Sequence, residues 1–160
     1  MKNNIHNDKP IIGIYGVNDE GSGDKYSKGA LMLNSLRHVI NNDAKWWEII
    51  KDYTTTFRHQ IIDTKTVITF FNQKSGMNLT PIFNQYLNYK EIPVLEIKYN
   101  KKRMKYRWVT DVTNFNMPVD LTVNGKIIRL FPKNSWSKSK FKINRNTTIE
   151  ILTSNFFVNT

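Results

Sequence analysis

The spacing of apolar residues changes once along the chain, at Ile92-Pro93. Before this point apolar residues recur every three or four positions, which is typical of amphipathic helices; after it they alternate with polar residues, which is typical of strands. Residues 1–25 follow neither pattern and are rich in Asn, Asp, Gly and Lys, so they predict an extended lead-in and loop. The sequence therefore predicts an α+β chain in three parts, 1–25, 26–92 and 93–160.

The middle part predicts four helices joined by short loops. Their ends are marked by Asp and Thr side chains that can cap a helix, by a proline suited to the first turn, and by a glycine that permits a left-handed end. The expected boundary residues are Tyr26 and Asp43 at the starts of the first two helices, Asp63 or Thr64 and Gly76 at the two ends of the third, and Thr80 and Pro81 at the start of the fourth.

The last part predicts a small antiparallel β-sandwich. "VLEIKY" and "MKYRWVT" alternate around the turn "NKKR", which favours a hairpin. "PVDLTVNGKIIRLF" favours a second hairpin, because Asn124-Gly125 can supply the positive φ angles of a type I′ turn. Shorter strands are expected around Trp136 and Phe141, in "TTIEILT" and in "FFV". Several short strands at this spacing are typical of a sandwich. Trp108 and Trp136 are expected to face its interior, with an exposed aromatic pair that could hold sugar or peptide as the alternative.

The net charge of the chain favours anionic partners in general. The sequence contains 24 Lys and Arg and 13 Asp and Glu, which gives a net charge of +11. The densest basic cluster is Lys101, Lys102, Arg103 and Lys105. We interpret it as a turn beside an edge strand whose lysines discourage sheet-to-sheet pairing, so no specific nucleic-acid site is predicted. The absence of cysteine excludes disulfides and thiolate metal sites. No apolar run approaches the ~20 residues of a membrane-spanning helix.

Residues for a complete catalytic site are missing from the sequence. His6, His38 and His59 are not spaced as in His-Glu-x-x-His, the helical zinc motif. Neither a Ser-His-Asp order, a phosphate-binding glycine loop nor a dense pair of carboxylates is present. The residues themselves therefore predict no metal or cofactor site in this chain.

One run of motifs nevertheless resembles a known family. "YSKGALMLNSLR", which opens at Tyr26, is followed by "WWEIIKDYTTTF", "SGMNL", "FNQYL" and "IPVLEIKY". This succession, over about residues 24–100, resembles the segment just beyond the metal site of the gluzincin aminopeptidases, the zinc metallopeptidases of the aminopeptidase N type. The resemblance implies that 26–92 is the four-helix end of a thermolysin-like catalytic domain and that 93–160 is the β-sandwich that follows it.

The resemblance also implies a function for the parent protein. In that family the His-Glu-x-x-His helix and a later glutamate bind zinc and precede the tyrosine, and this sequence contains neither. The resemblance therefore implies the C-terminal part of a zinc-dependent aminopeptidase that hydrolyses peptide bonds, with zinc and the peptide substrate bound only together with a missing N-terminal catalytic half. The isolated fragment is expected to be inactive. Many relatives are exported or periplasmic, and the compartment of the parent protein is left open.

Tyr26 is the catalytic residue that the resemblance implies, as a donor to the oxyanion of the transition state. Next to it, Lys28 is expected to be solvated or bonded to a carboxylate. Gly29 is expected to let the helix approach a neighbouring backbone. An alternative function, a noncatalytic peptide-binding or anion-binding module that uses the net positive charge, stays open at this point.

Overall fold

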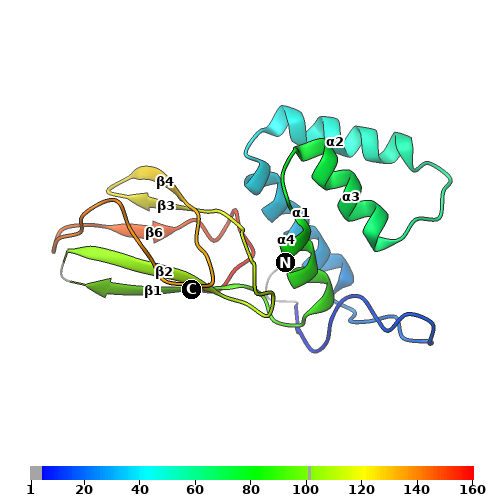
Figure 1. Ribbon diagram of the computed structural model, residues 1–160, viewed down its shortest axis with the longest axis horizontal. Helices are drawn as coiled ribbons and strands as arrows, with labels where there is room; N and C mark the ends of the chain where they lie inside the picture. The colour runs from blue at the N-terminus through cyan, green and yellow to red at the C-terminus, as the bar shows by residue number, and fades with distance from the viewer. Residues whose placement is uncertain (1–4, 101) are drawn as a thin grey trace.

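The computed structural model describes residues 5–100 and 102–160, so the first four residues of the predicted lead-in and Lys101 of the predicted turn lie outside the described residues. Four helices come first and two small antiparallel sheets follow, side by side with the helices (Figure 1). The α+β prediction is therefore confirmed. The division into separate units at residue 93 stays a prediction.

The four helices have nearly the bounds that the sequence predicts. Residues before α1 form turns and irregular chain, as expected of the lead-in. Gly76 ends the third helix in a left-handed conformation with φ 72°, as expected. The helices are α1 Lys25–Ile40, α2 Asp43–Thr56, α3 Thr64–Ser75 and α4 Thr80–Asn88.

The N-cap expected for α2 is one residue off. Asn42, rather than Asp43, is the cap, and its side-chain oxygen accepts the backbone N–H of Lys45 at 3.0 Å. Asp43 is the first helical residue and instead pairs with Arg37 of α1, whose Nε and Nη2 donate to its carboxylate at 2.8 and 2.6 Å. At α3 the prediction is confirmed, because the Asp63 carboxylate accepts the backbone N–H of Thr66.

The N-cap expected for α4 is wrong for a different reason. Thr80 is the first helical residue, and its hydroxyl oxygen accepts a hydrogen bond from the side-chain amide of Asn72 at 2.8 Å. The oxygen of the same amide accepts the backbone N–H of Leu79, also at 2.8 Å. The Asn78 side chain also accepts the backbone N–H of Thr80, at 3.2 Å, so Asn72 of α3 and Asn78 together satisfy the start of α4.

Two three-stranded antiparallel sheets form the second half, with orders β1-β2-β5 and β4-β3-β6. Asn124 and Gly125, with φ of 49° and 78°, turn the chain between β3 and β4 as predicted. The strands are β1 Val94–Asn100, β2 Arg103–Val109, β3 Val119–Val123, β4 Lys126–Leu130, β5 Ser137–Lys138 and β6 Ile149–Ile151.

Two of the expected short strands are absent from the part of the chain that the structure describes. The chain around Phe141 and the segment 156–158 are irregular. The latter is buried all the same, and Asn159 just beyond it forms a single parallel bridge with Val94 of β1. The apolar run "FFV" is therefore an irregular segment that packs against the rest of the core, and it is not a strand.

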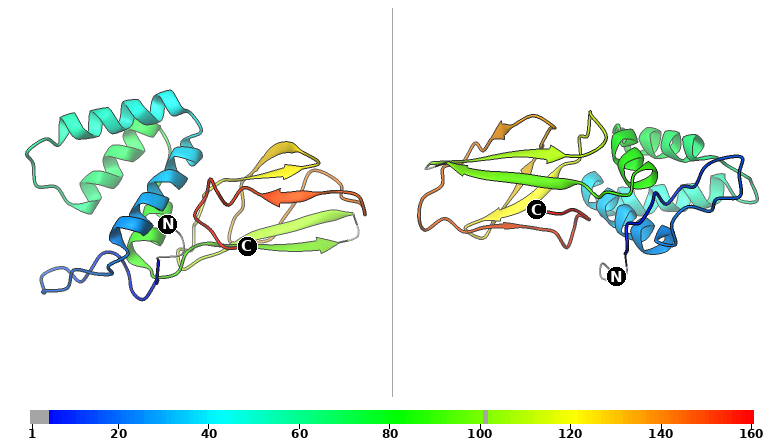
Figure 2. Two further views of the ribbon diagram at one scale, coloured as in Figure 1. Left: turned by 180° about the vertical axis from the view of Figure 1, so that it is seen from behind. Right: turned by 90° about the horizontal axis from the view of Figure 1, so that it is seen from below.

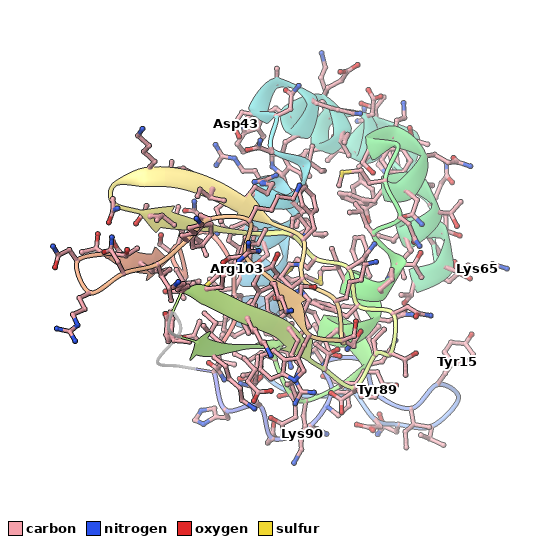
Figure 3. The ribbon with its side chains drawn as sticks, turned by 60° about the vertical axis from the view of Figure 1, so that its left-hand side comes forward. Tyr15, Asp43, Lys65, Tyr89, Lys90 and Arg103 are labelled. Carbon is pink, nitrogen blue, oxygen red and sulfur yellow. The ribbon has the colours of Figure 1, made fainter. Side chains whose placement is uncertain are left out.

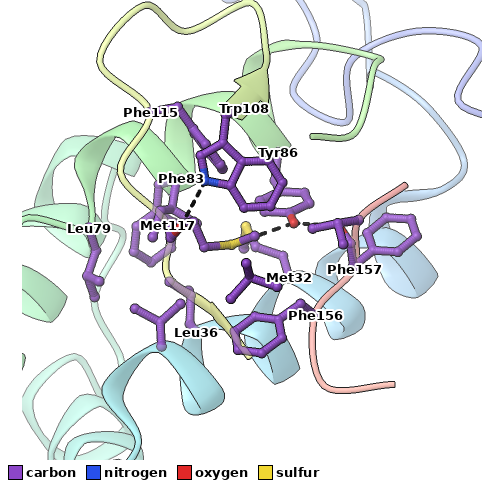
Figure 4. Close-up of a cluster of buried hydrophobic side chains, with 14 of the residues drawn as sticks. Met32, Leu36, Leu79, Phe83, Tyr86, Trp108, Phe115, Met117, Phe156 and Phe157 are labelled. Carbon is purple, nitrogen blue, oxygen red and sulfur yellow. Dashed lines mark hydrogen bonds between the residues drawn. The ribbon is translucent and has the colours of Figure 1, made fainter. Parts of the chain in front are cut away.

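One hydrophobic core runs through both halves. It joins the inner faces of the two sheets to the helices, and Figure 2 shows the sheets stacked beside the helical half. Trp108 lies inside it as expected, with its indole N–H donating to the carbonyl of Met117 at 2.9 Å (Figure 4). The expectation that Trp136 faces the interior is wrong, because its side chain is 36% exposed. Buried members in the close-up include Met32, Leu36, Leu79, Phe83, Tyr86, Phe115, Phe156 and Phe157.

Candidate functional site

Tyr26 lies on the first turn of α1 and points into solvent. It is 80% exposed, and within the described residues its hydroxyl has no hydrogen-bond partner. The ammonium group of Lys25 lies 5.9 Å from the centroid of the ring and also pairs with Glu20 at 3.2 Å. The phenol is therefore free to donate a hydrogen bond to a bound molecule.

Beside Tyr26 lies an open groove of about 670 Å³, a size that is typical of ligand sites. All four helices contribute to it, and Ile12 of the lead-in closes one side. Most of the lining is apolar, and the few polar groups are Lys25, Tyr26, Asp63 and Thr64 near the starts of α1 and α3. The groove is lined further by Ala30, Leu33, Tyr53, Val67, Phe71 and Leu87.

The N-cap residue of α1 is an aspartate, Asp24, whose side chain bonds to the lead-in instead of to the helix. Asp24 is buried, and its carboxylate accepts the backbone N–H groups of His6 and Asn7, the latter at 2.7 Å. The Ser22 hydroxyl donates to the carboxylate of Asp8 at 2.6 Å. These bonds tie the lead-in to the first turn of α1, so they fix the start of the helix that carries Tyr26.

The expectation that the Lys28 side chain is solvated or bonded to a carboxylate is wrong. It is fully buried, and its ammonium group donates to the carbonyl oxygens of Tyr89 and Lys90 at 3.0 and 2.7 Å, just past the end of α4. Figure 3 labels these two residues. Burial lowers the pKa of the Lys28 amine, and the Asp24 carboxylate opposes this shift. A cation at the carboxyl end of a helix is favourable, so Lys28 holds α4 against α1.

Gly29 does not mark a close backbone approach. A Cβ atom added at this position would meet no atom within 4 Å, so the space beside Gly29 is open. Gly29 lines the groove instead. The expectation for Gly29 is therefore wrong. Its missing side chain widens the groove one helical turn from Tyr26.

The histidines are separated in the fold. His6 belongs to the lead-in, His38 to the last turn of α1, and His59 to the loop after α2. Among residues 5–100 and 102–160, no group of three or more His, Cys, Asp or Glu side chains is arranged to hold a metal ion. These residues do not fit a zinc site. In the same part of the chain, no helix combines the length and the apolar character needed to cross a bilayer.

Comparison with known proteins gives one kind of match. No protein-family profile and no curated protein matches the sequence. Among solved structures, the fold is similar to that of Legionella pneumophila aminopeptidase A in complex with aspartic acid, with a TM-score of 0.64 and 14% sequence identity over 86% of this chain. This chain spans 18% of that chain. At this identity the likeness shows the fold alone, which is the fold of part of an aminopeptidase.

Proposed function

We propose that this chain is the C-terminal part of a zinc-dependent aminopeptidase that hydrolyses peptide bonds. The zinc-binding half then lies on a part of the protein outside this sequence, and the chain is inactive alone. One observation carries the proposal: the free phenol of Tyr26 beside an open groove, on a fold shared with part of an aminopeptidase. The order of the sequence motifs from Tyr26 onward supports it.

The role proposed for Tyr26 follows from the chemistry of amide hydrolysis. When a nucleophile adds to the scissile carbonyl, negative charge gathers on the carbonyl oxygen. A phenol that donates to this oxygen bonds more strongly in the transition state than in the ground state, and such a difference in binding lowers the barrier. Because Tyr26 has no hydrogen-bond partner among the described residues and is exposed, the phenol exchanges only bonds to water when it donates to the substrate.

The test is Tyr26→Phe in the longer protein that contains the zinc-binding half. We expect kcat to fall by about 10²–10³ with KM little changed, because only a bond made in the transition state is lost. Tyr15→Phe is the matched control, since Tyr15 is also exposed but lies in the lead-in loop (Figure 3). Turnover and zinc content are measured for both variants, and the zinc content should not change in either.

Three results would contradict the proposal. One is a full turnover number in Tyr26→Phe, which would remove the tyrosine from the mechanism. Another is peptide hydrolysis by the isolated chain supplied with zinc, since the described residues carry no group that fits the ion. The third is an upstream coding sequence without His-Glu-x-x-His, which would end the peptidase interpretation.

A further inference from the structure

The outer face of the β1-β2-β5 sheet carries an unusual set of charges. Side chains alternate between the two faces of a strand, and Leu95, Met104 and Trp108 are buried against the core. Their neighbours along β1 and β2 therefore face outward. The charged residues among them are Glu96, Lys98, Arg103, Lys105 and Arg107, and the pair Val94 and Val109 lies at the other end of the same face.

The cations form a row across the sheet. Lys98 of β1 is paired directly with Lys105 of β2, and Lys105 is paired directly with Lys138 of β5. Just after β5, Ser139 is buried and its backbone N–H donates to the carbonyl of Met104, and the next residue, Lys140, is exposed. Three ammonium groups thus cross all three strands, with further cations at the hairpin end.

An indole lies among these cations. The Trp136 ring centroid is 4.6 Å from Lys98 Nζ and 4.7 Å from the guanidinium carbon of Arg107. The single acidic group of the set, Glu96, accepts from Arg107 at 2.7 Å and pairs with Lys98 at 3.4 Å. We call this surface the cationic face, defined by Lys98, Arg103, Lys105, Arg107, Trp136, Lys138 and Lys140.

Protection of a sheet edge explains only part of the cationic face, because Lys98 and Lys138 lie on the outer strands β1 and β5 but the other strand cations lie on β2. The sequence places Arg103 and Lys105 in a turn beside an edge strand, whereas β2 is the central strand of its sheet. A central strand has no free edge to protect. Like charges directly opposite one another on a sheet are destabilising. Within the row Lys98–Lys105–Lys138, Glu96 offsets the charge of Lys98, and a bound anion would relieve the remaining repulsion.

The excess charge of the protein is concentrated in this half. Residues 93–160 contain 13 Lys and Arg against four Asp and Glu, a net charge of +9, whereas residues 1–92 contain 11 against nine, a net charge of +2. Arg103 lies over the sheets and Lys65 over the helices in Figure 3. An anionic polymer would therefore be drawn to the sheets rather than to the groove beside Tyr26.

We propose that the cationic face binds single-stranded nucleic acid through its phosphate backbone, without preference for sequence. A nucleic acid carries a phosphate at every residue and thereby supplies regularly spaced anions to rows of Lys and Arg. Its bases also supply ring faces for Trp136, as in other proteins that bind single strands. An acidic polypeptide matches the charges but offers nothing to stack on the indole. This proposal does not depend on the peptidase proposal.

The experiment measures fluorescence anisotropy of a labelled thymidine oligonucleotide of about 12 residues over a series of salt concentrations. Lys105→Gln/Lys138→Gln removes two members of the central row. Its matched control is Lys51→Gln/Lys65→Gln, which changes the net charge equally on exposed positions of α2 and α3. We expect the first pair to weaken binding about tenfold at low salt and to make the negative slope of log K against log salt shallower by about 1.4. The control pair should change both by much less.

Two further measurements complete the test. Trp136→Leu should weaken binding without changing the salt slope, because it removes a stacking surface and no charge. Thermal unfolding of Lys105→Gln/Lys138→Gln should occur at the same or a higher temperature than in the unchanged protein, since like-charge repulsion is relieved. Such a variant is folded, so a loss of binding is a loss of contacts.

Two outcomes would overturn the proposal. Equal weakening by both double variants would show that only the overall field of the protein attracts the oligonucleotide. Tighter binding of a polyglutamate of equal charge would show that the cationic face is a site for acidic polypeptides instead.

Discussion

At the scale of residues, Tyr26 and Lys28 show how two positions of one helix take opposite roles. They are two residues apart, which on an α-helix places them about 200° apart around the axis. Tyr26 therefore faces the solvent and the groove, while Lys28 enters the interior and meets the carbonyl groups that follow α4. The tyrosine can be found from sequence by resemblance. The burial of Lys28 cannot, because its partners lie about 60 positions further along the chain.

Replacing Lys28 tests this structural role. Lys28→Met keeps most of the side-chain volume but removes the donor to the carbonyls of Tyr89 and Lys90. We expect the free energy of unfolding to fall by about 2 kcal/mol, the usual contribution of hydrogen bonds made by a charged group. Lys25→Met is the control, because the Lys25 side chain is 40% exposed and pairs only at the surface. Urea denaturation measures both, and equal losses would contradict the assignment.

At the scale of elements, the period of the apolar residues was enough to predict all four helices and both hairpins. The periodicity could not decide which of two neighbouring residues, Asn42 or Asp43, is the N-cap of α2, because either side chain suits that position. It also failed at "FFV", residues 156–158. An apolar run becomes a strand only where a sheet edge is free to pair with it, and here the segment is held by other bonds, such as the Phe157 N–H to the Ser35 hydroxyl at 2.8 Å.

The start of α2 offers a direct test of the corrected cap. Asn42→Ala should lower the free energy of unfolding by about 1 kcal/mol, because the backbone N–H of Lys45 loses its acceptor. Asp43→Ala should have a smaller effect, since it removes only an exposed pair with Arg37 and a charge near the helix start. Both values come from urea denaturation. A larger loss for Asp43→Ala would restore Asp43 as the cap.

At the scale of the whole molecule, the two halves are joined by buried bonds as well as by the core. The Tyr86 hydroxyl of α4 donates to the carbonyl of Phe157, and Arg129 of β4 donates to the carbonyl of His38 at 2.8 Å while pairing with Asp120. Such contacts depend on how distant segments meet, so local sequence patterns do not contain them. The cationic face could not be predicted from the sequence for the same reason. The row Lys98–Lys105–Lys138 forms only because the register of the three strands places these residues opposite one another.

The bond between Tyr86 and Phe157 tests whether the halves unfold together. We expect one cooperative transition, with helical circular dichroism and the near-ultraviolet signal of the buried Trp46 and Trp108 lost at the same temperature, because the core is continuous. Tyr86→Phe removes a buried hydrogen bond and leaves a carbonyl unpaired, so it should cost about 1–3 kcal/mol and lower both midpoints by the same few degrees. Tyr99→Phe on β1 is the exposed control. If Tyr86→Phe lowered only the helical midpoint, the helices and the sheets would be independent units, and the boundary predicted at residue 93 would separate two domains.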